Sequence, residues 1–322
     1  MKTIGKVIGL AALLVATAAG AAHGPGEMVI VLNSGDGTVS IVDPATRKEV
    51  KRIPVGKEPH HLMATPDNKE LIVANAASND LVFLDPKSGE ILRRVPNISD
   101  PYQIGYSPDK KWFVSVSNRL DRVDIYAADF KLAKRIPTGK VPSHVAFTAD
   151  STIAFVTVQE SNEFIAIDLA TQKEIWKLPT GKQPAGIWMT PDDRHLLIGI
   201  TGESHVEVYD WRARKRVKKM LTGLGAHNFV ARGDGRHVFL SNRMANSISM
   251  IDQQTLEVKE TFNVPGGPDC MEVTKDGKQL WTTTRWIRML SVVDLESKKV
   301  VHQIPVGKSP HGLFFLSHAP RQ

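Results

Sequence analysis

The chain has 322 residues, of which 42% are hydrophobic and 23% are charged, a composition that excludes intrinsic disorder and suits one or two globular domains. The formal charge of +7 is a moderate basic excess, which favours acidic partners without naming one. Cys270 is the only cysteine, so an intramolecular disulfide and a CxxCH haem attachment motif are both excluded.

The first element in chain order has the pattern of a secretory signal. Two lysines precede an apolar run over residues 7–16, and small residues follow; this run is too short to span a bilayer. We expect a signal peptide at 1–21, a short tail at 22–27, and export to the periplasm or the cell exterior. No later segment holds 18 consecutive apolar residues, so we expect no transmembrane segment after signal removal and, in that compartment, no nucleic-acid partner.

From Met28 onward the chain is a repeat. A phrase of the form Gly-Lys-x-Pro, two variable residues and an apolar strand recurs at intervals of 41 or 42 residues. Its anchor positions are Pro59, Pro101, Pro142, Pro184, Ala226, Pro268 and Pro310. Each copy reads as four short β segments separated by turn residues. Four strands in a repeat of this length are typical of a propeller blade.

A second column of aspartates keeps step with the first. These residues each end an alternating apolar segment, at Asp43, Asp85, Asp168, Asp210, Asp252 and Asp294. Ala127 stands where the seventh aspartate would fall. We expect the aspartates to be structural and to cap the turns that follow them.

The incomplete copies at the two ends of the chain complement each other. The repeat region begins with the second, third and fourth strands of a blade, MVIVLN, TVSIVD and EVKRIPV, and it ends with HGLFF, a first strand without successors. The sequence therefore predicts an all-β, seven-bladed propeller over 28–316, built of four-stranded antiparallel blades and closed by strands from both termini. A C-terminal tail would occupy 317–322.

The two variable residues of each copy should gather at one mouth of the central channel, which we call the upper face, because the first strand of a blade is innermost. The first column reads His60, Tyr102, Ser143, Ala185, His227, Asp269 and His311, and the second reads His61, Gln103, His144, Gly186, Asn228, Cys270 and Gly312. Five of the 11 histidines and the only thiol fall in these columns. Such donors suit copper, zinc or haem iron. The predicted metal ligands are His60, His61, His144, His227, His311 and Cys270; alternatively, these histidines only satisfy backbone groups.

Basic side chains at the same face indicate a site for anions. Four lysines, Lys57, Lys140, Lys182 and Lys308, occupy the Gly-Lys-x-Pro loops, and four arginines, Arg119, Arg243, Arg285 and Arg288, follow second strands. Arginine can hold a carboxylate with two hydrogen bonds. The predicted ligand-binding residues are Arg243, Arg285, Trp286, Arg119 and Tyr102; alternatively, the charges belong to solvated turns. His23, near the expected new terminus, could bind copper or lie in a free tail, and with His318 it should occupy the opposite, lower face.

The repeat also resembles a known family. Segments 31–43, 73–85 and 240–252 (VLNSGDGTVSIVD, VANAASNDLVFLD, LSNRMANSISMID) are similar to the YVTN-type repeat of seven-bladed propellers, and the likeness covers about residues 26–316. The resemblance implies the fold. Its wider relatives include the haem-binding propeller of nitrite reductase and the copper-binding propeller of nitrous oxide reductase. The latter site needs seven histidines where this chain has five, and a complete nitrite reductase needs a c-type haem domain that this chain lacks.

No hydrolase motif of the GxSxG or HExxH type is present, and no catalytic residue is predicted. The favoured hypothesis is an exported, non-catalytic propeller that binds a small anionic ligand, a metal centre or a protein partner at the upper mouth. One alternative is a metal- or haem-dependent enzyme or cofactor-biogenesis protein that uses the same mouth. Another is an interaction scaffold whose basic rim binds an acidic periplasmic protein.

Overall fold

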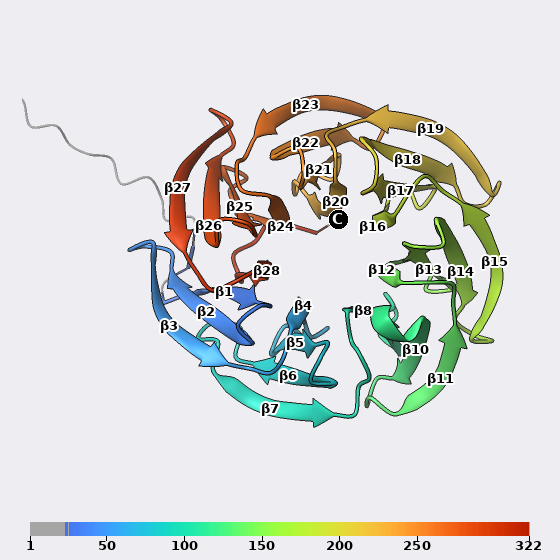
Figure 1. The fold of residues 1–322 in the computed structure, drawn as a ribbon, viewed down its shortest axis with the longest axis horizontal. Coiled ribbons are helices and arrows are strands. Elements are labelled where there is room, and N and C mark those ends of the chain that lie inside the picture. Colours follow the sequence, from blue (N-terminus) through green and yellow to red (C-terminus); the bar gives the residue numbers. More distant parts are fainter. Residues whose placement is uncertain (1–22, 25, 322) are drawn as a thin grey trace, which may run out of the picture.

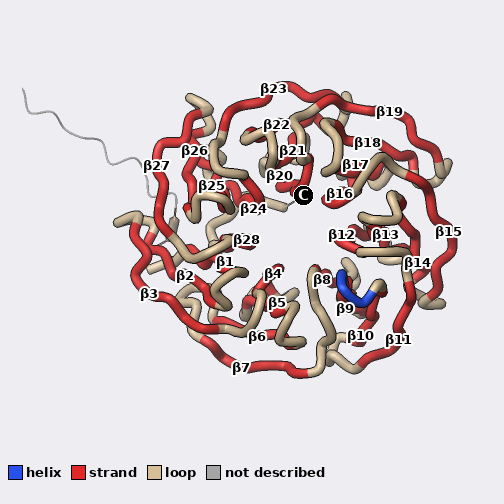
Figure 2. Tube along the Cα trace, in the orientation of Figure 1, coloured by secondary structure: helices blue, strands red, loops and turns tan. Residues whose placement is uncertain are grey.

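The computed structural model describes residues 23–24 and 26–321, so the predicted signal peptide at 1–21 lies outside the described residues. The described chain forms seven four-stranded antiparallel sheets set as blades around a central channel (Figure 1). The blades are strand and loop almost throughout (Figure 2), apart from one short 3-10 helix, η1 (Asn118–Leu120). The prediction of an all-β, seven-bladed propeller is confirmed. No helix among residues 23–24 and 26–321 is both long and apolar enough to cross a membrane.

Six blades follow one another along the chain, and in each of them the strands run in sequence order from the channel outward. Blade 1 contains β4 (Pro59–Ala64), β5 (Leu71–Asn75), β6 (Asp80–Leu84) and β7 (Ile91–Pro96). Blade 2 contains β8 (Gln103–Tyr106), β9 (Trp112–Ser117), β10 (Arg122–Ala127) and β11 (Leu132–Pro137). Blade 3 contains β12 (Pro142–Phe147), β13 (Ile153–Val158), β14 (Glu163–Asp168) and β15 (Lys173–Pro179).

Blade 4 contains β16 (Pro184–Met189), β17 (His195–Ile200), β18 (His205–Asp210) and β19 (Lys215–Leu221). Blade 5 contains β20 (Ala226–Ala231), β21 (His237–Asn242), β22 (Ser247–Asp252) and β23 (Glu257–Asn263). Blade 6 contains β24 (Pro268–Val273), β25 (Gln279–Thr284), β26 (Met289–Asp294) and β27 (Lys299–Pro305). Each outermost strand is largely exposed, whereas the second and third strands are buried.

Blade 7 joins the two ends of the chain. From the channel outward it contains β28 (Pro310–Phe314), β1 (Val29–Asn33), β2 (Thr38–Asp43) and β3 (Lys48–Pro54). Ile30 pairs with Phe314 across the closure, and the side chain of Asn33 accepts a hydrogen bond from the backbone N–H of Gly307 at 2.9 Å. The ring therefore closes with strands from both termini, because β28 pairs with the inner edge of β1.

The core lies between neighbouring blades and follows from the alternation of apolar residues. Ile30 and Leu32 of blade 7 and Leu71 and Val73 of blade 1 belong to one cluster, and all four have no exposed surface. Burial of each such side chain stabilises the fold by roughly 1.5–3 kcal/mol. Because equivalent clusters fill the other interfaces, the blades hold one another rigidly around the channel.

The aspartate column caps turns, as the sequence predicts. Asp43 accepts a hydrogen bond from the backbone N–H of Ala45 at 2.8 Å, and Asp210 accepts one from Ala213 at 2.9 Å. These short local bonds satisfy turn N–H groups that the ladder leaves free. The column therefore shapes the lower turns and takes no part in the channel mouth.

The C-terminal segment lies against the lower end of blade 6 and runs toward the middle of the ring (Figure 1). Ala319 donates its backbone N–H to the carbonyl of Val273 at 2.7 Å, and His318 pairs with Thr274 in an isolated bridge. His23 packs edge-on against Trp281 and lies near Ser317. His23 and His318 therefore lie away from the upper mouth.

Candidate functional site

A β-bulge at the start of the inner strand positions the two variable columns. In blade 3 the register of β12 advances from Pro142 to Val145 while β13 advances by only two residues. Ser143 and His144 therefore face a single residue of the neighbouring strand. The same shift occurs in blades 4 to 7. Because a bulge bends a strand and re-aims its side chains, residues of both columns can meet beside the channel.

Asp269 lies at the centre of the site, and its side chain has no exposed surface. Arg243 donates to Oδ1 of Asp269 at 2.9 Å, and Arg285 donates to Oδ2 at 3.2 Å. Ser309 orients Arg285 by accepting a hydrogen bond from its Nη2 at 2.7 Å. Burial opposes ionisation of Asp269, but Arg243 and the other neighbouring groups outweigh it and hold the pKa of this carboxyl well below its usual range. The carboxylate is therefore ionised at neutral pH.

His227 connects the two charged partners. Its Nε2 accepts a hydrogen bond from Arg243 at 2.7 Å, and its Nδ1 lies 2.9 Å from Oδ1 of Asp269. Since Nε2 is an acceptor, the ring proton belongs on Nδ1, facing the carboxylate. Burial, followed by the adjacent Arg243, lowers the pKa of His227 to about 4. Both ring nitrogens thus lie next to charged groups, Nε2 beside Arg243 and Nδ1 beside Asp269.

His311, His60 and Tyr102 form a stack along the inner wall. The ring centroids of His311 and His60 are 3.9 Å apart, and those of His60 and Tyr102 are 3.7 Å apart. The Nδ1 atom of each histidine forms a hydrogen bond with the backbone carbonyl of the following residue in the stack. His311 bonds to that of His60 at 2.5 Å, and His60 bonds to that of Tyr102 at 2.9 Å. A carbonyl only accepts, so Nδ1 carries the proton in both rings. Their Nε2 atoms therefore carry lone pairs.

The site carries one surplus positive charge. Arg243 and Arg285 share the single carboxylate of Asp269, and the two guanidinium side chains keep 21% and 23% of their surface exposed. Burial lowers the pKa of His311 to about 3 and that of His60 well below its usual value. The histidines are therefore neutral at pH 7 and do not add charge. The mouth is consequently electropositive because of its two arginines.

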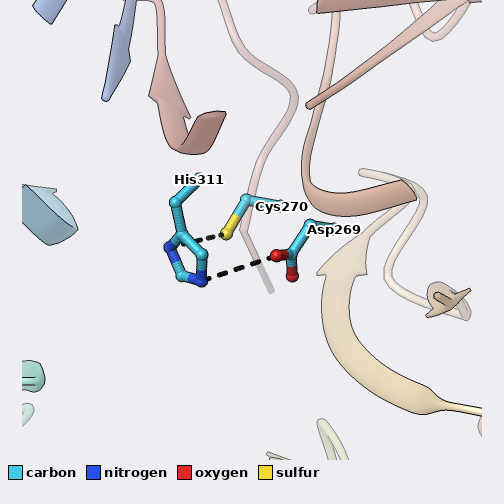
Figure 3. A group of neighbouring side chains, drawn as sticks. All are labelled: Asp269, Cys270 and His311. Carbon is cyan, nitrogen blue, oxygen red and sulfur yellow. Dashed lines mark hydrogen bonds and ion pairs between the residues drawn. The ribbon is translucent and has the colours of Figure 1, made fainter. Parts of the chain in front are cut away.

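The thiol of Cys270 lies beside this charged network (Figure 3). Its Sγ is 3.6 Å from Nδ1 of His311, and it accepts a hydrogen bond from Nδ2 of Asn228 at 3.2 Å. Burial, followed by the Asp269 carboxylate, raises the pKa of the Cys270 thiol well above its usual value. A nucleophilic cysteine needs a lowered pKa, so this environment does not favour catalysis by the free thiol.

Below the charged network the channel holds a cavity of about 250 Å³. It is lined by the second-column side chains His61, Asn228 and Cys270, and Glu272 and Arg321 form an ion pair there. Burial lowers the pKa of His61 to about 4. His61 thus lines the cavity below the Asp269 network and is not part of that network. Arg321 also lines a second pocket of about 320 Å³ nearby.

His144 approaches the network from blade 3. Its ring meets that of His227 edge-on, with the centroids 5.2 Å apart, and its Nδ1 is 2.8 Å from Oγ of Ser143. Burial, followed by the neighbouring histidines, lowers the pKa of His144 well below its usual value. The structure thus gathers the six predicted metal-ligand residues around one channel, but it distributes them between the mouth and the cavity below.

The other predicted ligand-binding residues divide into two groups. Tyr102 belongs to the aromatic stack, and burial raises the pKa of its hydroxyl. Arg119 is instead paired with Glu58 and Asp100, and Trp286 lies on the outer surface of the upper face with 53% of its area exposed. The structure does not bring Arg119 or Trp286 into contact with the Asp269 network.

Acidic neighbours neutralise much of the basic rim. Lys140 is paired with Asp121, and Lys308 lies 3.7 Å from Asp36. Exposed pairs of this kind contribute little stability, but they do cancel charge locally. Arg119, Lys140 and Lys308 therefore have acidic partners of their own, whereas Arg243 and Arg285 share a single carboxylate.

Two residues of the site were not predicted from the sequence. Asp269 is the anchor of the network, and Asn228 donates to both Asp269 and Cys270, at 3.3 and 3.2 Å. One signal was present in the sequence, because Asp269 is the only carboxylate in the two variable columns. Its role depends on arginines from two other loops, which no spacing rule connects to it.

The comparisons with known proteins agree with this architecture. The family model described as "YNCE-like beta-propeller" matches residues 5–321, whereas no curated protein sequence matches the chain. A functionally unknown protein from Desulfotomaculum acetoxidans is similar in structure, with a TM-score of 0.78, 15% identity, and coverage of 91% of this chain and 100% of that one.

Two further solved structures share the fold. Dihydro-heme d1 dehydrogenase NirN in complex with DHE has a TM-score of 0.68 and 17% identity, with coverage of 91% of this chain and 76% of that one. Hydrazine synthase of Kuenenia stuttgartiensis has a TM-score of 0.65 and 17% identity, with coverage of 78% and 87%. Identities this low establish the fold alone. The family match covers nearly the whole sequence, and the chain belongs to the YNCE-like β-propeller family.

Proposed function

We propose that this chain is an exported, non-catalytic binding protein that takes a small carboxylate-bearing ligand at the upper mouth of the channel. The observation that carries the proposal is the sharing of one buried carboxylate, Asp269, by two partly exposed guanidiniums, Arg243 and Arg285. A carboxylate ligand would offset the surplus positive charge and accept hydrogen bonds from the guanidinium N–H groups that Asp269 does not use. The signal-like residues 1–21 support export.

The aromatic stack favours a ligand that also has a flat apolar part. His311, His60 and Tyr102 lie beside the charged network, and the faces of their uncharged rings can pack against such a group. The similar fold of NirN, whose structure holds DHE, makes a carboxylate-bearing tetrapyrrole one ligand to test. Because the blades fix these side chains in advance, little conformational entropy is lost on binding.

The test is a calorimetric titration of the full processed chain with benzoate, succinate and protoporphyrin. Charge-assisted hydrogen bonds contribute about 1.5–3 kcal/mol, so Arg243→Gln and Arg285→Gln should each weaken carboxylate binding by roughly 10- to 100-fold. The matched control is Arg288→Gln, since Arg288 is exposed on the same loop as Arg285. Binding that is unchanged in both test variants would contradict the proposal.

A second candidate is a surface for a protein partner, and exposed apolar side chains favour it. Leu224 and Met244 lie on loops of blades 4 and 5, and Trp286 and Ile287 follow β25 in blade 6, with 40–56% of their surface exposed. A partner bound to this surface would contact these apolar side chains, two of which, Met244 and Trp286, follow Arg243 and Arg285 in the sequence. A partner that still binds after Arg243→Gln but is lost after Trp286→Ala would support this candidate instead.

A further inference from the structure

A donor cluster at the base of the mouth has the composition of a metal site. One atom each from Asp269, Cys270 and His311 can be chosen so that all three lie within 4.8 Å of one another. Figure 3 shows the thiol near Nδ1 of His311, at 3.6 Å, and the carboxylate near Nε2, also at 3.6 Å. Thiolate and imidazole together prefer soft or borderline metal ions.

An unpartnered nitrogen is an independent indication of a cation site. His311 is 2% exposed, and its Nδ1 uses its proton on the carbonyl of His60 at 2.5 Å. Nε2 therefore carries a lone pair, yet it is buried, has no hydrogen-bond partner among the described residues, and lies 3.6 Å from Oδ2 of Asp269. Oδ2 already accepts a hydrogen bond from Arg285 at 3.2 Å, whereas the lone pair of Nε2 has no donor, and a buried acceptor without a partner is unfavourable.

Charge balance selects the kind of cation. Arg243 and Arg285 already leave the network with one surplus positive charge, and a free thiol is protonated at neutral pH. A monovalent ion that replaces the thiol proton leaves the buried charge unchanged, since the exchange is Cys–SH + Cu⁺ → Cys–S–Cu + H⁺. A divalent ion such as Zn²⁺ would add a second uncompensated charge beside two guanidiniums, which is costly in a buried site.

The surroundings of the sulfur suit a metal-bound thiolate. Asn228 donates its amide N–H to Sγ of Cys270 at 3.2 Å, which stabilises negative charge on sulfur. Cys270 also lines the cavity of about 250 Å³, so an ion in the channel can reach it. The other ring nitrogen of His311, Nδ1, donates to the backbone carbonyl of His60 at 2.5 Å, which is a common second-shell contact of metal-ligating histidines. Asp269 keeps both guanidiniums and remains the nearby countercharge.

We propose that Cys270 and His311 bind a Cu(I) ion, through Sγ and the free Nε2, with Asp269 as the fixed countercharge beside them. This site lies below the carboxylate site of the proposed function and does not depend on it. The two sites share Asp269 and His311 but not Cys270, so a variant of Cys270 can separate them.

The test is an anaerobic titration of the full processed chain with Cu(I) in competition with bicinchoninate. One Cu(I) should bind per chain, and Cys270→Ser should lower the affinity by at least ~100-fold, beyond the loss expected from an outer-shell change. His311→Gln should weaken binding at least ~10-fold. His195→Gln, in a histidine outside the cluster, serves as the control and should bind like the wild type. X-ray absorption should show a copper–sulfur contact that Cys270→Ser removes.

Thermal unfolding of each variant shows whether the fold persists, and Cys270→Ser is nearly isosteric. Equal Cu(I) affinity in the wild type and Cys270→Ser would overturn the proposal, and so would binding of Zn²⁺ without binding of Cu(I). Cys270→Ser distinguishes the two sites, because it should weaken Cu(I) binding and leave carboxylate binding in place. Failure of the carboxylate titration alone would overturn the proposed function and not the copper site.

Discussion

Replacing Asp269 by asparagine tests the central ion-pair network. The substitution keeps the shape of the side chain but removes the only negative charge between Arg243 and Arg285. Loss of one partner from a buried pair costs about 3–5 kcal/mol. The two arginines retain 21% and 23% of their side-chain exposure, so solvent reduces the penalty and we expect the lower end, about 3 kcal/mol.

The assay is reversible denaturation with urea, followed by tryptophan fluorescence, with thermal unfolding as a second measure. For a domain of this size, a loss of about 3 kcal/mol corresponds to a melting temperature lower by roughly 5 °C. Acetate should restore part of the lost stability in Asp269→Asn, because the anion can bind to the partly exposed guanidiniums of Arg243 and Arg285. The control is Asp129→Asn at an exposed pair with Lys131, for which we expect less than about 1 kcal/mol. A loss below about 1 kcal/mol in Asp269→Asn would refute the reasoning.

Three other predictions concern stability and access. Arg236 and nearby turn N–H groups lower the pKa of Asp252 to about 2. Because the pKa of Asp252 is lower in the folded state than in the unfolded state, ionised Asp252 stabilises the fold by about 2 kcal/mol above about pH 4, and this stabilisation is lost as the pH falls toward 2. The free energy of unfolding should therefore depend less on pH over that range in Asp252→Asn than in the wild type. An unchanged slope would contradict this. Gly186→Ala should lower stability by about 3 kcal/mol in urea unfolding, since a Cβ would lie 1.8 Å from the backbone oxygen of His227; an unaltered midpoint would argue against this packing. Arg321→Ala should raise the alkylation rate of Cys270 several-fold by opening the channel from below, and an equal rate would show that the upper mouth is the only entrance.

The ring and its closure were predictable because they depend on periodicity. Two columns of residues kept the same spacing over seven copies, and the unpaired first strand at Pro310 matched the missing first strand before Val29. Blade topology then required the variable residues to approach one channel. Hydrophobic alternation and turn chemistry are local properties, so a single sequence is enough to reveal them.

The arrangement within the site was less predictable because it depends on contacts between blades. The bulge that re-aims both columns is a backbone feature without a spacing signature, and the pairing of Asp269 with arginines from two loops depends on the reach of long side chains. The neutralisation of Arg119 by Glu58 and Asp100 likewise joins residues of different loops. Sequence spacing identified the candidates, whereas their roles followed from distances.

The most direct test of the central claim is a crystal of the protein soaked in an iodobenzoate and measured at a wavelength where iodine scatters anomalously. Our account predicts that the carboxylate contacts Arg243 and Arg285 while the iodinated ring lies beside the His60 stack, so that an iodine peak appears at the upper mouth. Iodine peaks only elsewhere on the protein, at a concentration that saturates binding in solution, would contradict it.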